Sequence, residues 1–151
     1  MRQDSRLSRL LHVMLHMEGH SGPITSEVIS TMLGSNPAVV RRIMAGLREA
    51  GYVTSEKGHG GGWTLARPLS EITLLDVYRA LGPAEIFAFG LANPTPQCLV
   101  EQAVNSAMRT ALEEAEQTLL TRFGEIALSD IASDFRQRSD GIPAHTHHRF
   151  G

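Results

Sequence analysis

The chain has 151 residues, of which 42% are hydrophobic and 5% are aromatic, and it contains one cysteine. This length fits one hydrophobic core with a helical appendage, and a single cysteine excludes an intrachain disulfide framework. No stretch approaches the roughly 20 apolar residues that span a bilayer, and the N-terminal residues do not form an apolar secretory segment. We therefore expect a cytoplasmic protein that has no membrane partner.

The net charge of −2 is unevenly distributed along the chain. Residues 1–67 carry eight Lys or Arg and five Asp or Glu, which gives +3, whereas residues 68–151 carry six and eleven, which gives −5. The overall charge argues against nucleic-acid binding, and the asymmetry could arise by chance. A basic first part followed by an acidic second part nevertheless fits a DNA-binding module joined to an assembly or sensing region.

Hydrophobic residues at helical spacing predict three helices in the first third of the chain, over residues 5–18, 25–33 and 36–50. Each begins at a residue whose side chain can accept a hydrogen bond from the first turn: Ser5, Thr25 and Asn36. Pro37 takes the first position of the third helix, where a missing N–H costs nothing. Val40, Ile43, Met44 and Leu47 form the expected core face of that helix.

Two short strands, residues 52–55 and 63–66, flank a glycine-rich loop and predict a β-hairpin. A fourth helix is expected over residues 73–81, with Thr73 as its cap. Residues 82–97 contain Gly-Pro and Asn-Pro pairs and should be mostly loop.

The longest helix is predicted over residues 99–123, which corresponds to a length of about 35 Å. A last short helix should begin at Ser129, and the polar tail from Arg136 onward should be disordered. The predicted organisation is a winged helix-turn-helix DNA-binding domain (1–82), a linker or sensor loop (83–98), dimerisation helices (99–135) and a disordered tail (136–151). The predicted fold class is mainly α.

The order helix, helix, tight turn, helix, hairpin is the winged helix-turn-helix plan, whose second motif helix enters the major groove with its N-terminal residues. Arg41 and Arg42 could bind a guanine edge or a phosphate, Asn36 could bind adenine or a phosphate, and Val39 could contact a thymine methyl. Pro37 belongs to the same candidate interface. The alternative is a capped helix with a solvated basic face.

The hairpin tip is the second candidate for contact with DNA. Gly58, Gly60, Gly61 and Gly62 remove side-chain bulk, so that the backbone can approach a phosphate closely; Lys57 adds charge, and His59 could contact the minor groove or the backbone. Thr25, at the positive end of the second helix, is a further candidate phosphate site. The alternative explanation of the glycine-rich loop is an ordinary turn.

Several separated motifs resemble the Rrf2 family of bacterial transcription regulators (IscR, NsrR and CymR are members): GHGGG at 58–62, LARP at 65–68, ITLLDV at 72–77 and NPTPQC at 93–98. The segment NPAVVRRIM at 36–44 resembles the recognition helix of the YwnA-like branch. The resemblance covers about residues 3–135. It implies a homodimer whose 99–123 helices cross, a palindromic operator and a possible sensor region around residues 90–110.

Members that bind an iron–sulfur cluster carry three cysteines in that region, whereas this chain has only Cys98. We therefore expect no cofactor. Cys98 could instead be a redox- or thiol-responsive sensor, because the start of a helix lowers a thiol pKa, and the alternative is an idle thiol. The effector is unknown.

Other candidate chemistry is sparse. His12 and His16 are four residues apart on the first helix, a spacing that metals can use, although a structural role is the favoured interpretation. His145, His147 and His148 lie in the tail, without a fixed scaffold. We expect no metal site, no catalytic residues and no enzymatic activity.

The sequence therefore predicts a sequence-specific regulator, more specifically a repressor, that binds double-stranded DNA as a homodimer through the 99–123 helix. The alternative is a winged-helix protein-interaction module without specific DNA binding.

Overall fold

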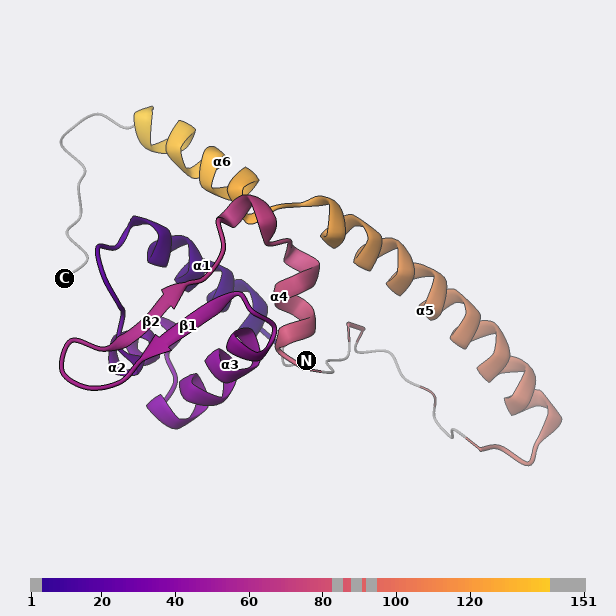
Figure 1. The fold of residues 1–151 in the computed structure, drawn as a ribbon. Helices are drawn as coiled ribbons and strands as arrows, with labels where there is room; N and C mark the ends of the chain where they lie inside the picture. Colours follow the sequence, from indigo (N-terminus) through magenta and orange to yellow (C-terminus); the bar gives the residue numbers. More distant parts are fainter. Residues whose placement is uncertain (1–3, 83–85, 88–90, 92–94, 142–151) are drawn as a thin grey trace.

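The computed structural model describes residues 4–82, 86–87, 91 and 95–141. A globular body is built from helices α1 (Arg6–Gly19), α2 (Ser26–Leu33), α3 (Pro37–Glu49) and α4 (Leu74–Ala80), with a hairpin of strands β1 (Val53–Glu56) and β2 (Gly62–Leu65). A 3₁₀ turn, η1 (Leu69–Glu71), leads into α4. Helices α5 (Leu99–Glu125) and α6 (Leu128–Asp140) follow, and α5 projects away from the body (Figure 1).

Local capping sets the beginnings of the helices that form the body. Thr25 accepts a hydrogen bond from Val28 N–H, and Thr73 forms a reciprocal capping box with Asp76. Ser5 occupies the predicted N-cap position of α1, but its side chain makes no capping hydrogen bond, and the Asp4 carboxylate accepts from the Arg6 N–H instead.

The core lies where α1, α2, α3, α4 and the hairpin meet. Its side chains with no solvent exposure include Leu10, Val13, Met14, Ile29, Val40, Met44, Leu47, Ile72, Val77 and Leu128. Helices α3 and α4 approach closely at Gly46, where an added Cβ would lie 2.6 Å from the Ala80 carbonyl oxygen. Glycine, which has no Cβ, is therefore required at this crossing.

The two strands pair antiparallel, with Val53 opposite Leu65 and Glu56 opposite Gly62. Both begin one residue away from their predicted positions. Strand β2 begins at Gly62, whose φ is 148°. A Cβ added at this residue would lie 2.5 Å from the Ile24 carbonyl oxygen. Only glycine allows strand β2 to begin beside the backbone that precedes α2.

The junction between α5 and α6 is tied to the body through the backbone. Leu74 N–H donates to Ile126 O at 3.0 Å, and Leu128 N–H donates to Ile72 O at 2.8 Å. Edge-to-face contact between Tyr78 and Phe123 adds a side-chain link between α4 and α5. The orientation of the projecting helix is thereby coupled to α4.

Both C-terminal helices are longer than predicted. Helix α5 continues through Gly124, which packs against the Leu75 side chain, and α6 begins at Leu128 and reaches Asp140. The first part of the segment predicted as a disordered tail is therefore helical, with an Arg138–Asp134 pair at i, i+4 on its last turns. The rest of that prediction, residues 142–151, lies outside the described residues, as does most of the predicted 83–98 loop. Within the described residues, no helix is long and apolar enough to cross a membrane.

Candidate nucleic-acid interface

The exposed face of α3 carries the residues that the sequence predicts to contact DNA. Asn36 caps the helix, because its Oδ1 accepts a hydrogen bond from Val39 N–H at 3.0 Å, and Pro37 occupies the first turn. Arg41 and Arg42 follow on the exposed side, while Val39 is half-buried. Since the cap uses Oδ1, the Asn36 side chain offers its amide N–H groups to a ligand and suits a phosphate better than a two-point adenine contact.

Arg41 forms an ion pair with Glu27 of α2, with its guanidinium nitrogen 3.6 Å from the carboxylate oxygen. The two side chains are 61% and 67% exposed, so the pair contributes little stability. It is easily exchanged for a stronger contact with a nucleic acid. Glu27 was not identified as a site residue from the sequence, because i-to-i+14 partners on different helices leave no local pattern.

The tip of the hairpin is open to solvent, and Lys57, Gly58, His59 and Gly60 are all exposed. Gly58 and Gly60 have φ values of 96° and 79°, and no atom lies within 4 Å of a Cβ added to either. These glycines are needed for the turn and leave the backbone bare. The predicted close approach of backbone to a phosphate is sterically available here.

The hairpin is fixed to the helix-turn-helix by Trp63, which is only 7% exposed. Its indole N–H donates to Ser26 Oγ at 3.0 Å, and its backbone exchanges hydrogen bonds of 2.8 and 3.0 Å with Ile24. On the α3 side, the Arg48 guanidinium lies 5.8 Å from the centre of the Trp63 ring and donates to Ser55 Oγ at 3.3 Å. The β1–β2 hairpin, which is the wing of the winged-helix motif, thus forms one unit with helices α2 and α3.

Sequence reasoning missed Ser26 and Arg48 as residues that position the wing. The one signal available was that this chain has a single tryptophan and places it in the hairpin. Thr25, the candidate phosphate site, lies next to the same anchor at the start of α2. Its Oγ1 accepts the capping hydrogen bond from Val28 N–H, so the hydroxyl proton and the backbone N–H groups of the first turn can both be donated to a phosphate.

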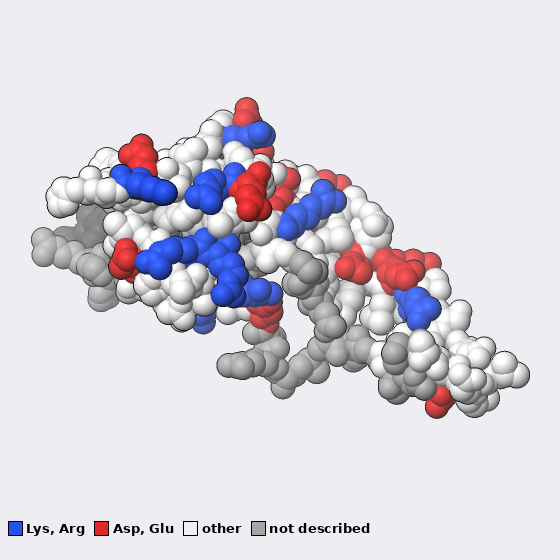
Figure 2. All heavy atoms as spheres, turned by 60° about the horizontal axis from the view of Figure 1, so that its bottom comes forward, with Lys and Arg blue, Asp and Glu red and all other residues white. Residues whose placement is uncertain are grey.

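Basic side chains gather on the body and acidic side chains are frequent on the projecting part (Figure 2). The exposed arginines of α3 are Arg41, Arg42 and Arg48, while α5 carries five glutamates and two arginines. The basic first part and the acidic second part of the sequence therefore also form separate regions of the surface. A polyanion is attracted to the body and repelled by much of α5.

The predicted sensor residue, Cys98, lies immediately before α5, and its side chain is exposed. Its sulfur makes no capping hydrogen bond, yet it faces the backbone N–H groups of Glu101 and Val100, which lower the thiol pKa. A lowered pKa increases the thiolate fraction, which is the reactive form.

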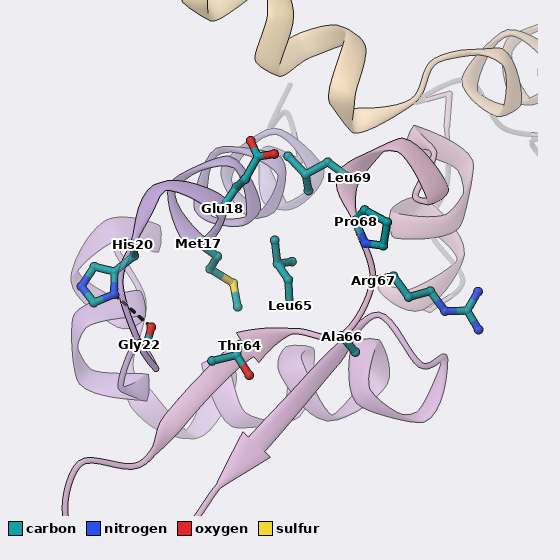
Figure 3. Close-up of a pocket in the computed structure, with 10 residues that line it drawn as sticks. All are labelled: Met17, Glu18, His20, Gly22, Thr64, Leu65, Ala66, Arg67, Pro68 and Leu69. Carbon is teal, nitrogen blue, oxygen red and sulfur yellow. Dashed lines mark hydrogen bonds between the residues drawn. The ribbon is translucent and has the colours of Figure 1, made fainter.

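An open hollow of about 450 Å³ lies between the end of α1 and the base of the wing (Figure 3). His20 at its rim is already bonded to Gly22 O at 3.1 Å, and the Arg67 side chain points away from the centre. The polar groups do not converge on one point, so the hollow does not have the features of a small-molecule site.

Residues 3–134 match the Rrf2 family, described as "Iron-dependent Transcriptional regulator". The chain is 30% identical over 128 residues to YwnA of Bacillus subtilis, named as an HTH-type transcriptional regulator, covering 85% of this chain and 95% of YwnA. The matched relatives are regulators, which confirms the prediction that this chain is not an enzyme.

Solved structures share the fold at low identity. A transcriptional regulator from Lactobacillus plantarum superimposes with a TM-score of 0.72 at 20% identity, covering 87% of this chain and 90% of that one. IscR of T. potens gives a TM-score of 0.65 at 21% identity, with 95% and 93% covered. These likenesses confirm the mainly α, winged-helix fold class.

Proposed function

Because the chain belongs to the Rrf2 family of transcriptional regulators, we propose that it binds a palindromic operator as a homodimer and acts as a repressor. Membership of the family implies DNA binding. The observation that supports specific binding by this chain is the junction of α2, α3 and the wing at Trp63, which presents two contact elements in a fixed relation. We accordingly propose a cytoplasmic location.

Helix α3 and the wing would contact different parts of the DNA. Helix α3 would enter the major groove with Arg41 and Arg42 toward base edges, while Asn36 and the first turn of α2 would contact phosphates. The wing would follow the neighbouring backbone, with Lys57 supplying charge and Gly58 and Gly60 allowing close approach. His59 would contact the backbone or the minor groove.

Homodimerisation is supported by the projecting helix. Leu99, Val100, Val104 and Met108 are exposed by 79%, 71%, 51% and 36%, and the last three repeat at i, i+4 and i+8 along α5. A contiguous apolar stripe of this kind is unfavourable in water and indicates a protein partner. If two copies cross at this stripe, each copy presents its α3 and wing to one half-site. The centres of the two half-sites would then lie about 34–36 Å apart on one face of the DNA.

The direct test begins with selection of operators from random duplexes and compares two variants on the selected site. Arg41→Ala should relax base preference at one position per half-site by about 1–3 kcal/mol, because an arginine-to-base contact is lost. Lys57→Ala should weaken binding to all sequences alike and reduce the salt slope by about one phosphate contact. Fluorescence anisotropy at several salt concentrations measures both effects.

If Arg41→Ala and Lys57→Ala each lost the same affinity for the selected duplex as for random duplexes, this division of roles would be contradicted. Failure of selection to enrich any sequence, together with a flat salt dependence, would instead favour the interaction-module alternative.

The family is described as iron-dependent, so the fit of this chain to an iron–sulfur cluster can be tested on its donor groups. Such clusters are held by several thiolates, and the sequence contains one cysteine. In the part of the chain that the structure describes, no group of three His, Cys, Asp or Glu residues could hold a metal ion. The donor set does not fit a cluster, and the proposed regulator acts without one.

Cys98 is the proposed sensing residue, because it is exposed and its pKa is lowered. Oxidation of the parent protein should change operator affinity, and Cys98→Ser should remove that change while binding DNA like the reduced parent. Anisotropy titrations under a thiol reductant and under hydrogen peroxide make the comparison. Identical oxidant sensitivity in the serine variant would eliminate the thiol switch.

A further inference from the structure

The exposed face of α1 carries two imidazoles that converge on each other. His12 and His16 are one turn apart, and their Nε2 atoms lie 2.8 Å apart. The ring centroids are 4.6 Å apart, and the ring planes are inclined by 55°. The sequence alone favoured a structural role for both residues, but both are exposed on the helix surface, opposite the buried Val13 and Met14.

We propose that His12 and His16 form a surface site for a late first-row divalent metal ion, Ni²⁺ or Cu²⁺, bound through the two Nε2 atoms. In the tautomer with the proton on Nδ1, each imidazole presents a lone pair at Nε2, and imidazole is a preferred ligand of these metals. The hydrogen bond between the two nitrogens is then replaced by two metal–nitrogen bonds.

The separation of the two nitrogens allows both to bind the same metal ion. Metal–imidazole bonds of about 2.0–2.1 Å at a right angle place two nitrogens about 2.8–3.0 Å apart, whereas the tetrahedral angle of Zn²⁺ requires about 3.3–3.4 Å. The 2.8 Å between the Nε2 atoms is a hydrogen-bond distance between two exposed side chains, and it lies within reach of the right-angle geometry of square-planar or octahedral Cu²⁺ and Ni²⁺ after a small rotation of the rings.

The charges around the pair are compatible with a cation. Arg9, one turn before His12, donates to Leu33 O at 2.6 Å, so its guanidinium is held at the end of α2. The remaining coordination positions would be filled by water or a small ligand, because no third donor side chain is grouped with the pair in the described residues.

The test uses the full-length chain with His145, His147 and His148 changed to Gln, so that the tail cannot bind the probe. Calorimetric titration with Ni²⁺ alone should give one ion per chain, and Mg²⁺, which prefers oxygen ligands, should give no binding. His12→Gln or His16→Gln should each weaken Ni²⁺ binding by about tenfold or more, because the second bond of a chelate is lost. Ni²⁺ should raise the Tm of the parent clearly more than the Tm of either variant at the same Ni²⁺ concentration.

His20→Gln is the matched control, because His20 is an exposed histidine at the end of the same helix and should leave Ni²⁺ affinity unchanged. Melting curves without metal should coincide for all variants, since the substituted side chains are exposed. Unchanged Ni²⁺ affinity in the His12→Gln/His16→Gln double variant would overturn the proposal. So would Ni²⁺ binding that disappears when only the tail histidines are replaced.

Discussion

Val104→Glu should convert the protein into a folded monomer with greatly weakened binding to a two-half-site operator. Val104 is half exposed in the protomer, at the centre of the apolar stripe on α5, so a charge there costs the isolated protomer little. Between two crossed helices, the same carboxylates would be desolvated and close to each other, which is strongly unfavourable. Sedimentation equilibrium should show the monomer.

The DNA-binding consequence follows from effective concentration. In a dimer, binding of the first half-site makes binding of the second intramolecular, and loss of this coupling should lower operator affinity by about 10²–10⁴-fold. Affinity for a duplex with a single half-site should be unchanged, because the α3 and wing contacts are untouched. Anisotropy titrations of both duplexes separate the two effects.

Ser106→Glu provides the matched control, since Ser106 is exposed on α5 but lies two residues from Val104 and so points about 200° around the helix. It adds the same charge and should preserve the dimer and its operator affinity. A dimeric Val104→Glu protein with parental affinity would show that the stripe is not the dimer contact.

The elements that could be predicted from the sequence are those governed by local chemistry. Helices α2 and α3 have a cap and an apolar repeat within a few residues, and the structure confirms the Thr25 and Asn36 caps. Ser5 lies at the N-cap position without a capping hydrogen bond, and the neighbouring Asp4 carboxylate accepts from the Arg6 N–H in the first turn. The N-cap preference of Ser, Thr, Asp and Asn identifies residues that can cap a helix, but it does not determine which of two adjacent candidates accepts the hydrogen bond.

The parts that could not be predicted depend on residues far apart in the chain. The wing glycines illustrate this, since Gly58 and Gly60 lie in open space as expected of a DNA-contacting tip, whereas Gly61 and Gly62 are required by backbone contacts to Glu56 and Ile24. One run of glycines therefore has two functions, and only the fold separates them.

The same limit applies to the interface and to the C-terminal helices. The exposed basic face of α3 could be predicted from periodicity, but the Arg41–Glu27 pair could not, because it joins two helices. Helix α6 was predicted too short because its last turns are polar throughout and show no apolar repeat. Polar i, i+4 pairs such as Arg138–Asp134 stabilise a helix without leaving the signal on which the prediction relied.

The second large effect is expected at Trp63, where Ala should destabilise the protein by about 3–5 kcal/mol. The side chain is buried, and it connects β2 to α2 through Ser26 and to α3 through Arg48. A loss of this size is a large share of the roughly 5–15 kcal/mol that holds a domain of this kind together. Chemical denaturation followed by circular dichroism measures it.

A double-mutant cycle isolates the contribution of the wing anchor. Trp63→Phe keeps most of the apolar burial and removes the indole N–H, while Ser26→Ala removes the acceptor, and each should cost about 1–2 kcal/mol. Because both changes delete the same 3.0 Å hydrogen bond, the double variant should lose clearly less than the sum of the two single losses.

Thr54→Ala is the control, since its hydroxyl pairs with that of Thr64 on the exposed side of the hairpin and should contribute under about 0.5 kcal/mol. If the losses at Trp63 and Ser26 are fully additive, the hydrogen bond does not anchor the wing. A coupled loss accompanied by weaker binding to all duplexes, with base preference unchanged, would mean that this anchor positions the wing on the DNA backbone while α3 retains its base contacts.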